Sequence, residues 1–180
     1  GVAVTTGVKN TLIGGLAGDA LNTSNNNVAV GYQALSTDVK GTKTVAIGYQ
    51  ALFDQNFSTN TDTYNVAVGY LAGANVTTGV QNTLIGGLAG DAITTGTHNV
   101  ALGIGTGGAI TEGIRNTCLG ASAGDAITTG DSNIIIGFVS DVSAADGNNQ
   151  FVLGNGVTSV GNGNFTFGDG TTDSNIAHGA

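Results

Sequence analysis

Residues 77–92 read TTGVQNTLIGGLAGDA, and residues 5–20 read TTGVKNTLIGGLAGDA, so the two stretches differ only at Gln81 and Lys9. Inside each lies a pentapeptide: Asn, a small or β-branched residue, an apolar residue, an aliphatic residue and Gly. The pentapeptide starts at Asn10, Asn27, Thr44, Asn65, Asn82, Asn99, Asn116, Asn133, Gln150, Asn164 and Asn175. Seven of the ten steps between these starts are 17 residues long, and the others are 21, 14 and 11. Duplication of one unit explains this pattern.

A 17-residue unit is too short for a helical-hairpin repeat and fits one coil of a parallel β-solenoid. The composition agrees with this architecture. Gly accounts for 32 of the 180 residues, and Thr, Asn and Val are also abundant. We therefore expect an all-β, single-chain parallel β-solenoid or β-roll of about ten coils, about 45 to 50 Å long. Residues 1–154 form regular repeats with a longer coil at 44–64, and residues 155–180 form shorter, irregular coils leading toward a following segment.

The pentapeptide predicts which side chains are interior. Its second and fourth positions lie on one face of a strand and carry β-branched and large aliphatic residues, so we expect them to fill the coil. A second apolar column, at Leu21, Val76, Ile93, Ile110 and Ile127, would close the core from the opposite side. A column of Ala separates the two: Ala17, Ala34, Ala51, Ala72, Ala89 and Ala123.

Two further columns predict the turns. Gly ends every pentapeptide, and another Gly recurs at Gly41, Gly79, Gly96, Gly113, Gly130 and Gly147. Both columns indicate positive φ or a close backbone approach. The recurrent Asn is expected to stack its amide on the Asn one coil away and to tolerate a left-handed backbone.

The middle position of the pentapeptide would then point outward, yet it is apolar in nine coils. A solvated face would carry polar side chains there. We expect this strip to be covered by copies of the same chain, most simply as a homotrimer around a fibre axis. The predicted oligomer interface is Leu12, Ala29, Ala46, Ala67, Leu84, Ala101, Cys118, Ile135 and Val152.

Composition excludes several other roles. The net charge is -8 with only four Lys and Arg residues, so the chain is a poor partner for nucleic acid. No apolar run approaches the roughly 20 residues of a membrane span. His98 and His178 have no second ligand at metal-binding spacing, and no catalytic triad, phosphate loop or cofactor fingerprint occurs. We predict no enzyme activity, catalytic residue, metal or cofactor.

Three coils carry a resemblance to known proteins. Residues 27–35 read NVAVGYQAL, residues 44–52 read TVAIGYQAL and residues 65–73 read NVAVGYLAG. These coils, together with turns such as Thr77-Thr78-Gly79, resemble the repeat region of bacteriophage tail-fibre proteins. They are also similar to the heads of trimeric autotransporter adhesins, whose coils are shorter. The resemblance implies a trimeric fibre and a left-handed coil for the adhesin-like form. Because both chain ends fall inside a coil, we also expect the fibre to continue beyond them.

Candidate ligand-binding residues fall into two groups. Tyr32, Tyr49 and Tyr70 follow the pentapeptide Gly in three consecutive coils, so their rings should form a ladder that could stack on sugars or simply pack together. The long coil carries Phe53 and Phe57, and an insertion in a solenoid is often a binding loop, although it can also be neutral decoration.

These observations predict a structural or adhesive segment of a phage tail fibre that projects a receptor-binding region for host attachment. The alternative is a bacterial trimeric surface adhesin or an extracellular filament subunit. Asp91 and Asp125, two coils apart, leave a tailspike glycosidase as a remote third hypothesis. The expected location is the virion surface or another extracellular site. The expected partners are further copies of the chain, fibre or virion proteins at both ends, and host surface carbohydrate or protein.

Overall fold

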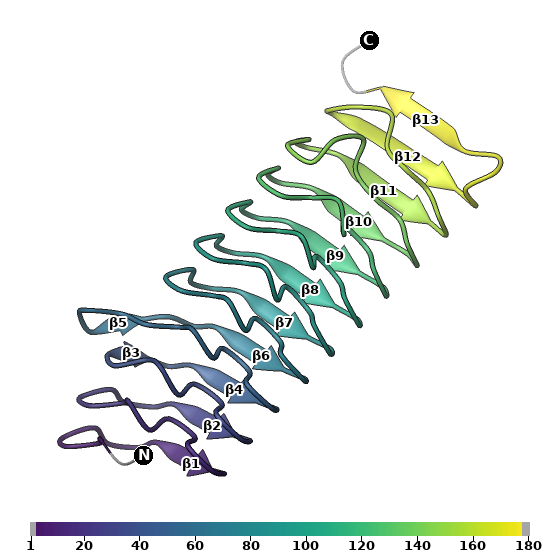
Figure 1. Cartoon of the computed structure of the whole chain (residues 1–180). Coiled ribbons are helices and arrows are strands. Elements are labelled where there is room, and N and C mark those ends of the chain that lie inside the picture. The colour runs from purple at the N-terminus through teal and green to yellow at the C-terminus, as the bar shows by residue number, and fades with distance from the viewer. Residues whose placement is uncertain (1–2, 178–180) are drawn as a thin grey trace.

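The computed structural model describes residues 3–177, which form one elongated stack of coils without a helix (Figure 1). The main sheet has eleven strands in the order β1-β2-β4-β6-β7-β8-β9-β10-β11-β12-β13. Their bounds are β1 Thr11–Ile13, β2 Val28–Val30, β4 Val45–Ile47, β6 Val66–Val68, β7 Thr83–Ile85, β8 Val100–Leu102, β9 Thr117–Leu119, β10 Ile134–Ile136, β11 Phe151–Gly154, β12 Asn164–Gly168 and β13 Ser174–Ala177. A separate pair, β3 Gly41–Thr42 and β5 Thr61–Asp62, lies beside the long coil.

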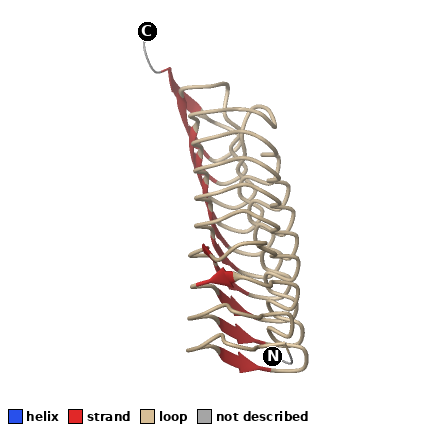
Figure 2. Ribbon diagram, turned by 90° about the vertical axis from the view of Figure 1, so that its left-hand side faces the viewer, coloured by secondary structure: helices blue, strands red, loops and turns tan. Residues whose placement is uncertain are grey.

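The strands pair in the register that the repeat predicts. Leu84 of β7 lies beside Ala101 of β8, 17 residues later, and the same offset holds along the regular coils. Across the long coil the offset becomes 21, with Ala46 beside Ala67. Figure 2 shows the strands of the main sheet along one side of the rod, with mostly loops and turns on the other side. The prediction of an all-β parallel solenoid is confirmed, with about nine turns.

The side chains of the strands face the opposite way from the prediction, with the middle position inward and the second and fourth positions outward. Leu84, at the middle position of its pentapeptide, is completely buried within the single chain, whereas Ile85 beside it is 36% exposed. The predicted oligomer interface is therefore wrong, because these side chains form the core of the coil itself. They are Leu12, which is partly buried in the first coil, and the buried Ala29, Ala46, Ala67, Leu84, Ala101, Cys118, Ile135 and Val152.

Volume explains the reversal. The opposite apolar column and the Ala column are buried as predicted, and they leave little space in front of the strand. A Cβ on Gly90 would lie 2.7 Å from Cδ2 of Leu84, so one Leu already fills its coil. In the coil of Ala29, the buried Leu35 supplies that volume from the far side. Two side chains per coil, from the second and fourth positions together, would exceed this space. The single middle side chain therefore points inward and the other two point outward.

The two Gly columns serve different purposes. The Gly that ends each regular pentapeptide has positive φ, as at Gly103 (138°). Gly113, in the second column, lacks positive φ, but a Cβ there would lie 2.5 Å from the Gly130 carbonyl oxygen. The first column therefore combines positive φ with a close backbone approach, as at Gly86, and the second column has the close approach without positive φ.

The recurrent Asn forms a buried hydrogen-bond ladder. The Asn116 N–H donates to Oδ1 of Asn99 at 2.9 Å, and Nδ2 of Asn99 donates to the Gly113 carbonyl at 2.8 Å. The left-handed residue is the one that precedes the Asn, such as His98 with φ of 60°. Each Asn thus ties one coil to the next and closes its own coil at the turn.

The C-terminal end departs from the repeat. The pentapeptide at Asn175 does not begin a coil, because β13 runs antiparallel to β12. Eleven residues are too few for a full coil and suffice for a reversal, in which Oδ1 of Asp169 accepts the N–H groups of Thr171 and Thr172. His178 and the last pentapeptide Gly, Gly179, lie outside the described residues.

Candidate functional site

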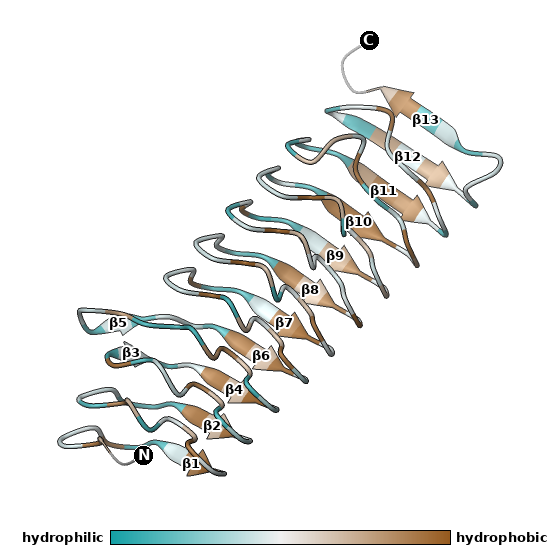
Figure 3. Cartoon of the chain, in the orientation of Figure 1, coloured by the Kyte–Doolittle hydropathy of each residue, from teal (hydrophilic) through white to brown (hydrophobic). Residues whose placement is uncertain are grey.

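The outward strand face is an uncharged surface that runs along the rod. We define it as the second and fourth pentapeptide positions between Thr11 and Phe167. Its members are Thr11, Ile13, Val28, Val30, Val45, Ile47, Val66, Val68, Thr83, Ile85, Val100, Leu102, Thr117, Leu119, Ile134, Ile136, Phe151, Leu153, Phe165 and Phe167. None of these residues is charged, and Figure 3 shows the apolar colour repeating from strand to strand. Thr11, Thr83 and Thr117 are its only polar members, and its fourth-position side chains are aliphatic or aromatic in every coil. A monomer seldom leaves such an apolar strip in water.

Beyond the pentapeptide Gly, a second exposed apolar surface adjoins the first. We call it the corner column, and it gathers the large exposed apolar side chains that lie one or two residues after that Gly. They are Leu16, Tyr32, Tyr49, Tyr70, Leu88, Ile104, Phe138 and Val139. Ile104 is 64% exposed and Phe138 is 60% exposed. The rod therefore presents two apolar sides that meet at the Gly corner.

The three Tyr rings form the predicted ladder. The centroids of Tyr32 and Tyr49 are 5.7 Å apart and those of Tyr49 and Tyr70 are 5.3 Å apart, with interplanar angles of 18° and 14°. Both faces of the Tyr49 ring are therefore covered by its neighbours. A sugar could not stack on that central ring, and the ladder presents mainly ring edges and hydroxyl groups.

Two polar side chains interrupt the apolar core, one in the long coil and one in the coil before it. The column that holds Leu21, Val76 and Ile93 carries Asp38 and Gln55 at the two coils around the insertion, and both are buried. Nε2 of Gln55 donates to Oδ2 of Asp38 at 2.6 Å, while Oε1 of Gln55 accepts from Nδ2 of Asn65 at 2.8 Å. Oδ1 of Asp38 accepts the N–H groups of Lys40, Gly41 and Phe57. Asp38 thus caps amides at the point where the insertion separates neighbouring coils.

Burial raises the pKa of the Asp38 carboxyl above its ordinary value of 3.8, and the hydrogen bonds from Gln55 and the backbone amides only partly oppose this effect. A raised pKa in the folded state means that Asp38 favours folding below 3.8 and that this contribution is lost as pH rises through the folded pKa. We expect the free energy of unfolding of the wild type to fall, relative to Asp38→Asn, as pH rises above about 4. Denaturant titrations of both proteins across this range measure the difference. A difference that stays constant with pH would contradict the assignment.

The insertion also builds the β3 and β5 pair. Nζ of Lys43 lies 2.5 Å from Oδ2 of Asp62 and 3.0 Å from the Tyr64 hydroxyl, and Thr42 donates to Oδ1 of Asp62 at 2.7 Å. The hydrogen bonds that the Lys43 ammonium donates to Asp62 and Tyr64 raise the pKa of Lys43. These contacts fix the loop that follows Phe57.

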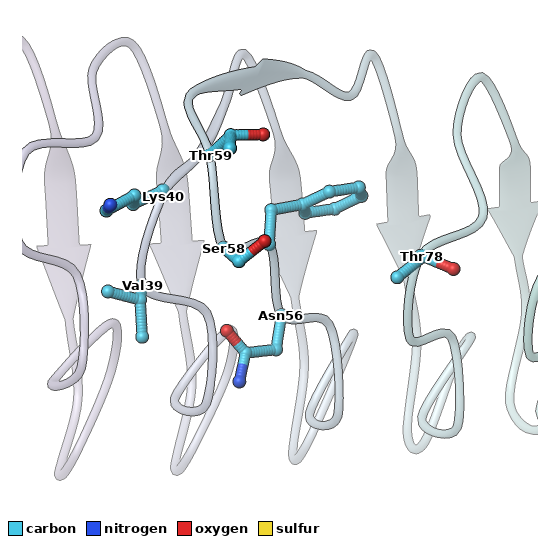
Figure 4. Close-up of a pocket in the computed structure, with 7 residues that line it drawn as sticks. Val39, Lys40, Asn56, Ser58, Thr59 and Thr78 are labelled. Atoms are coloured by element: carbon cyan, nitrogen blue, oxygen red, sulfur yellow. The ribbon is translucent and has the colours of Figure 1, made fainter.

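A hollow of about 480 Å³ lies beside this loop (Figure 4). Its lining residues are Val39, Lys40, Asn56, Phe57, Ser58, Thr59 and Thr78. Of the two aromatic residues predicted to bind ligand here, Phe57 lines the hollow and is 8% exposed, while Phe53 is half-buried and does not line it. Sequence reasoning missed Lys40, Asn56 and Thr78, since three different coils bring them together.

The remaining candidate groups are the two Asp residues of the glycosidase hypothesis and the single Cys. Oδ1 atoms of Asp91 and Asp125 both approach Gly108, and burial, followed by the charge of Asp125, raises the pKa of Asp91. Residues 3–177 contain no cluster of three or more His, Cys, Asp or Glu side chains suited to a metal ion. Burial raises the pKa of the Cys118 thiol to about 12, so this thiol stays protonated.

Comparison with protein-family models, curated proteins and solved structures gives no significant match to the chain. Within residues 3–177, no helix could cross a membrane.

Proposed function

We propose that the chain is a structural segment of an extracellular fibre of the phage tail-fibre type, in which three copies lie side by side along a common axis. The main observation that supports this proposal is the uncharged outward strand face, which runs along the rod. Water contact with this face is unfavourable, and burial against another copy removes it.

The dimensions of the surface support association. Strand spacings of about 4.8 Å give the face a length of roughly 45 Å and a width of roughly 10 Å. With the adjoining corner column, the apolar surface approaches the roughly 800 Å² per partner of a standard protein interface.

The arrangement of the two apolar sides favours a ring. The strand face of one copy can lie against the corner column of the next, which is a head-to-tail contact that forms a ring when the rotation between copies closes. Three copies of a wedge with two adjoining apolar sides close around an axis and hide both surfaces. The uncharged centre and the polar turns on the outside then suit a rigid shaft, which would hold a receptor-binding region away from the virion.

Native mass spectrometry tests this assembly, and we expect a species with three times the 17.6 kDa chain mass. The Leu102→Asp variant should yield folded monomers, because Leu102 is 47% exposed on the strand face and a carboxylate there would be buried in the assembly. The control Thr95→Asp places the same charge on an exposed turn and should remain trimeric. A wild-type chain that stays monomeric and folded would refute the proposal.

A further inference from the structure

The hollow beside the long coil is a product of the four additional residues. The regular coils stack their turns directly, as where the Thr77 N–H donates to the Thr94 carbonyl at 2.9 Å. In the long coil the chain leaves this stack after Phe57 and returns through β5, which pairs with β3 of the previous coil. Figure 4 shows Val39 and Lys40 on one coil, Asn56, Ser58 and Thr59 on the next, and Thr78 on the one after it.

The loop that forms one wall is held in place. The Lys43 and Asp62 ion pair fixes its C-terminal end, and the Asp38 carboxyl accepts the Phe57 N–H at its start. At the tip, the Thr23 hydroxyl donates to Oδ1 of Asn60 at 3.1 Å, which ties the loop to an earlier coil. The hollow is therefore formed before any ligand arrives, which lowers the entropic cost of binding.

The lining offers a specific chemistry. Ser58, Thr59 and Thr78 supply hydroxyl groups and Asn56 supplies an amide, while Val39 and Phe57 supply apolar surface. This mixture is suited to a ring with both hydroxyl groups and CH surface, and the volume lies in the range of small-molecule sites.

Lys40 supplies the positive charge of the lining, from the edge of the hollow (Figure 4). It is one of only four cationic Lys and Arg residues in the chain, and it is the only charged residue in the lining. Within residues 3–177 the ion pair is that of Lys43 with Asp62, so the Lys40 ammonium lacks an acidic partner. Asp38, two residues earlier, is buried and is occupied by Gln55 and the backbone amides.

We propose that this hollow binds an acidic sugar unit, with its carboxylate against Lys40 and its hydroxyl groups on the Ser, Thr and Asn side chains. The site goes beyond the shaft role, because it gives the side of the rod an affinity for acidic polysaccharide. It lies on the turns and not on the outward strand face, so it is independent of the assembly proposed above.

Ligand-observed NMR with the whole chain at neutral pH tests the site. The probes are glucuronate, galacturonate and N-acetylneuraminate, with glucose and galactose as neutral counterparts and inorganic sulfate as a simple anion. At least one acidic sugar should bind about tenfold or more tightly than its neutral counterpart and than sulfate. Absence of binding by all three acidic sugars, equal binding of the neutral sugars, or equal binding of sulfate would overturn the proposal.

Variants locate the binding. Lys40→Gln should weaken binding of the acidic sugar by about tenfold, and Lys40→Arg should retain that affinity. Lys9→Gln removes the same charge elsewhere and should leave the affinity unchanged. Thr78→Phe fills the hollow without a change of charge and should abolish binding. Each variant is compared by circular dichroism with the wild type. Unchanged affinity in folded Lys40→Gln or Thr78→Phe would refute the site, whatever the oligomeric state.

Discussion

Replacement of Ala29 with Leu should destabilise the rod by about 3 kcal/mol, and addition of Leu35→Gly should restore most of that loss. Ala29 and Leu35 are both completely buried and belong to one coil. A second large side chain at position 29 would overlap Leu35, whose far-side position already fills the interior. Leu35→Gly alone should cost a similar amount by leaving a cavity.

The double variant copies an arrangement that the chain already contains. In the first coil, Leu12 lies beside Ala29 in the sheet, and a Cβ on Gly18 would come 2.7 Å from Cδ2 of Leu12. Leu35 has φ of 53°, a conformation that Gly adopts without strain. Equilibrium denaturation of the two single variants and the double variant measures the coupling. If the losses of the single variants simply add in the double variant, the proposed exchange of volume within a coil is wrong.

The same pairs show what the sequence could have revealed about the core. The 17-residue period is sufficient to predict the parallel register and the buried opposite column. It cannot identify the inward face of a strand such as Val28-Ala29-Val30, because all three residues are apolar and no alternation separates the faces. An informative signal occurs in four coils, where a large residue at the middle strand position or at the position six later is paired with a small one, as in Leu84 with Gly90 and Ala29 with Leu35. Ala67 and Ala101 do not follow this relation, because each is followed by Gly six residues later.

The surface features also differ in how well the sequence predicts them. The Tyr ladder follows from a single column, so its stacking could be predicted from spacing alone. The hollow depends on where four additional residues leave the stack and on which coils they then face. Asp38 and Gln55, which support the hollow, lie 17 residues apart in one column of neighbouring coils, so the repeat places them together. It does not predict that Asp38 also accepts the Phe57 N–H at the start of the loop.

Two adjacent glycines provide the second test of large effect. Gly86→Ala should destabilise the rod by about 3 kcal/mol or more, whereas Gly87→Ala should be neutral or stabilise it by up to about 1 kcal/mol. Gly86 has φ of 135°, and a Cβ there would lie 2.3 Å from the Gly103 carbonyl oxygen. That oxygen belongs to the backbone of the next coil, so the clash cannot be relieved by a side-chain rotation.

Gly87 is a closely matched control. It lacks positive φ, and an added Cβ would lie 3.9 Å from Cγ1 of Ile104, in ordinary contact. An Ala there also reduces the conformational freedom of the unfolded chain. Thermal and denaturant unfolding of the two variants should therefore differ strongly although the substitutions are chemically identical and one residue apart. Equal stabilities would mean that the coils are not stacked in this register at the Gly corner, and the continuous strand face inferred from that stacking would be lost with it.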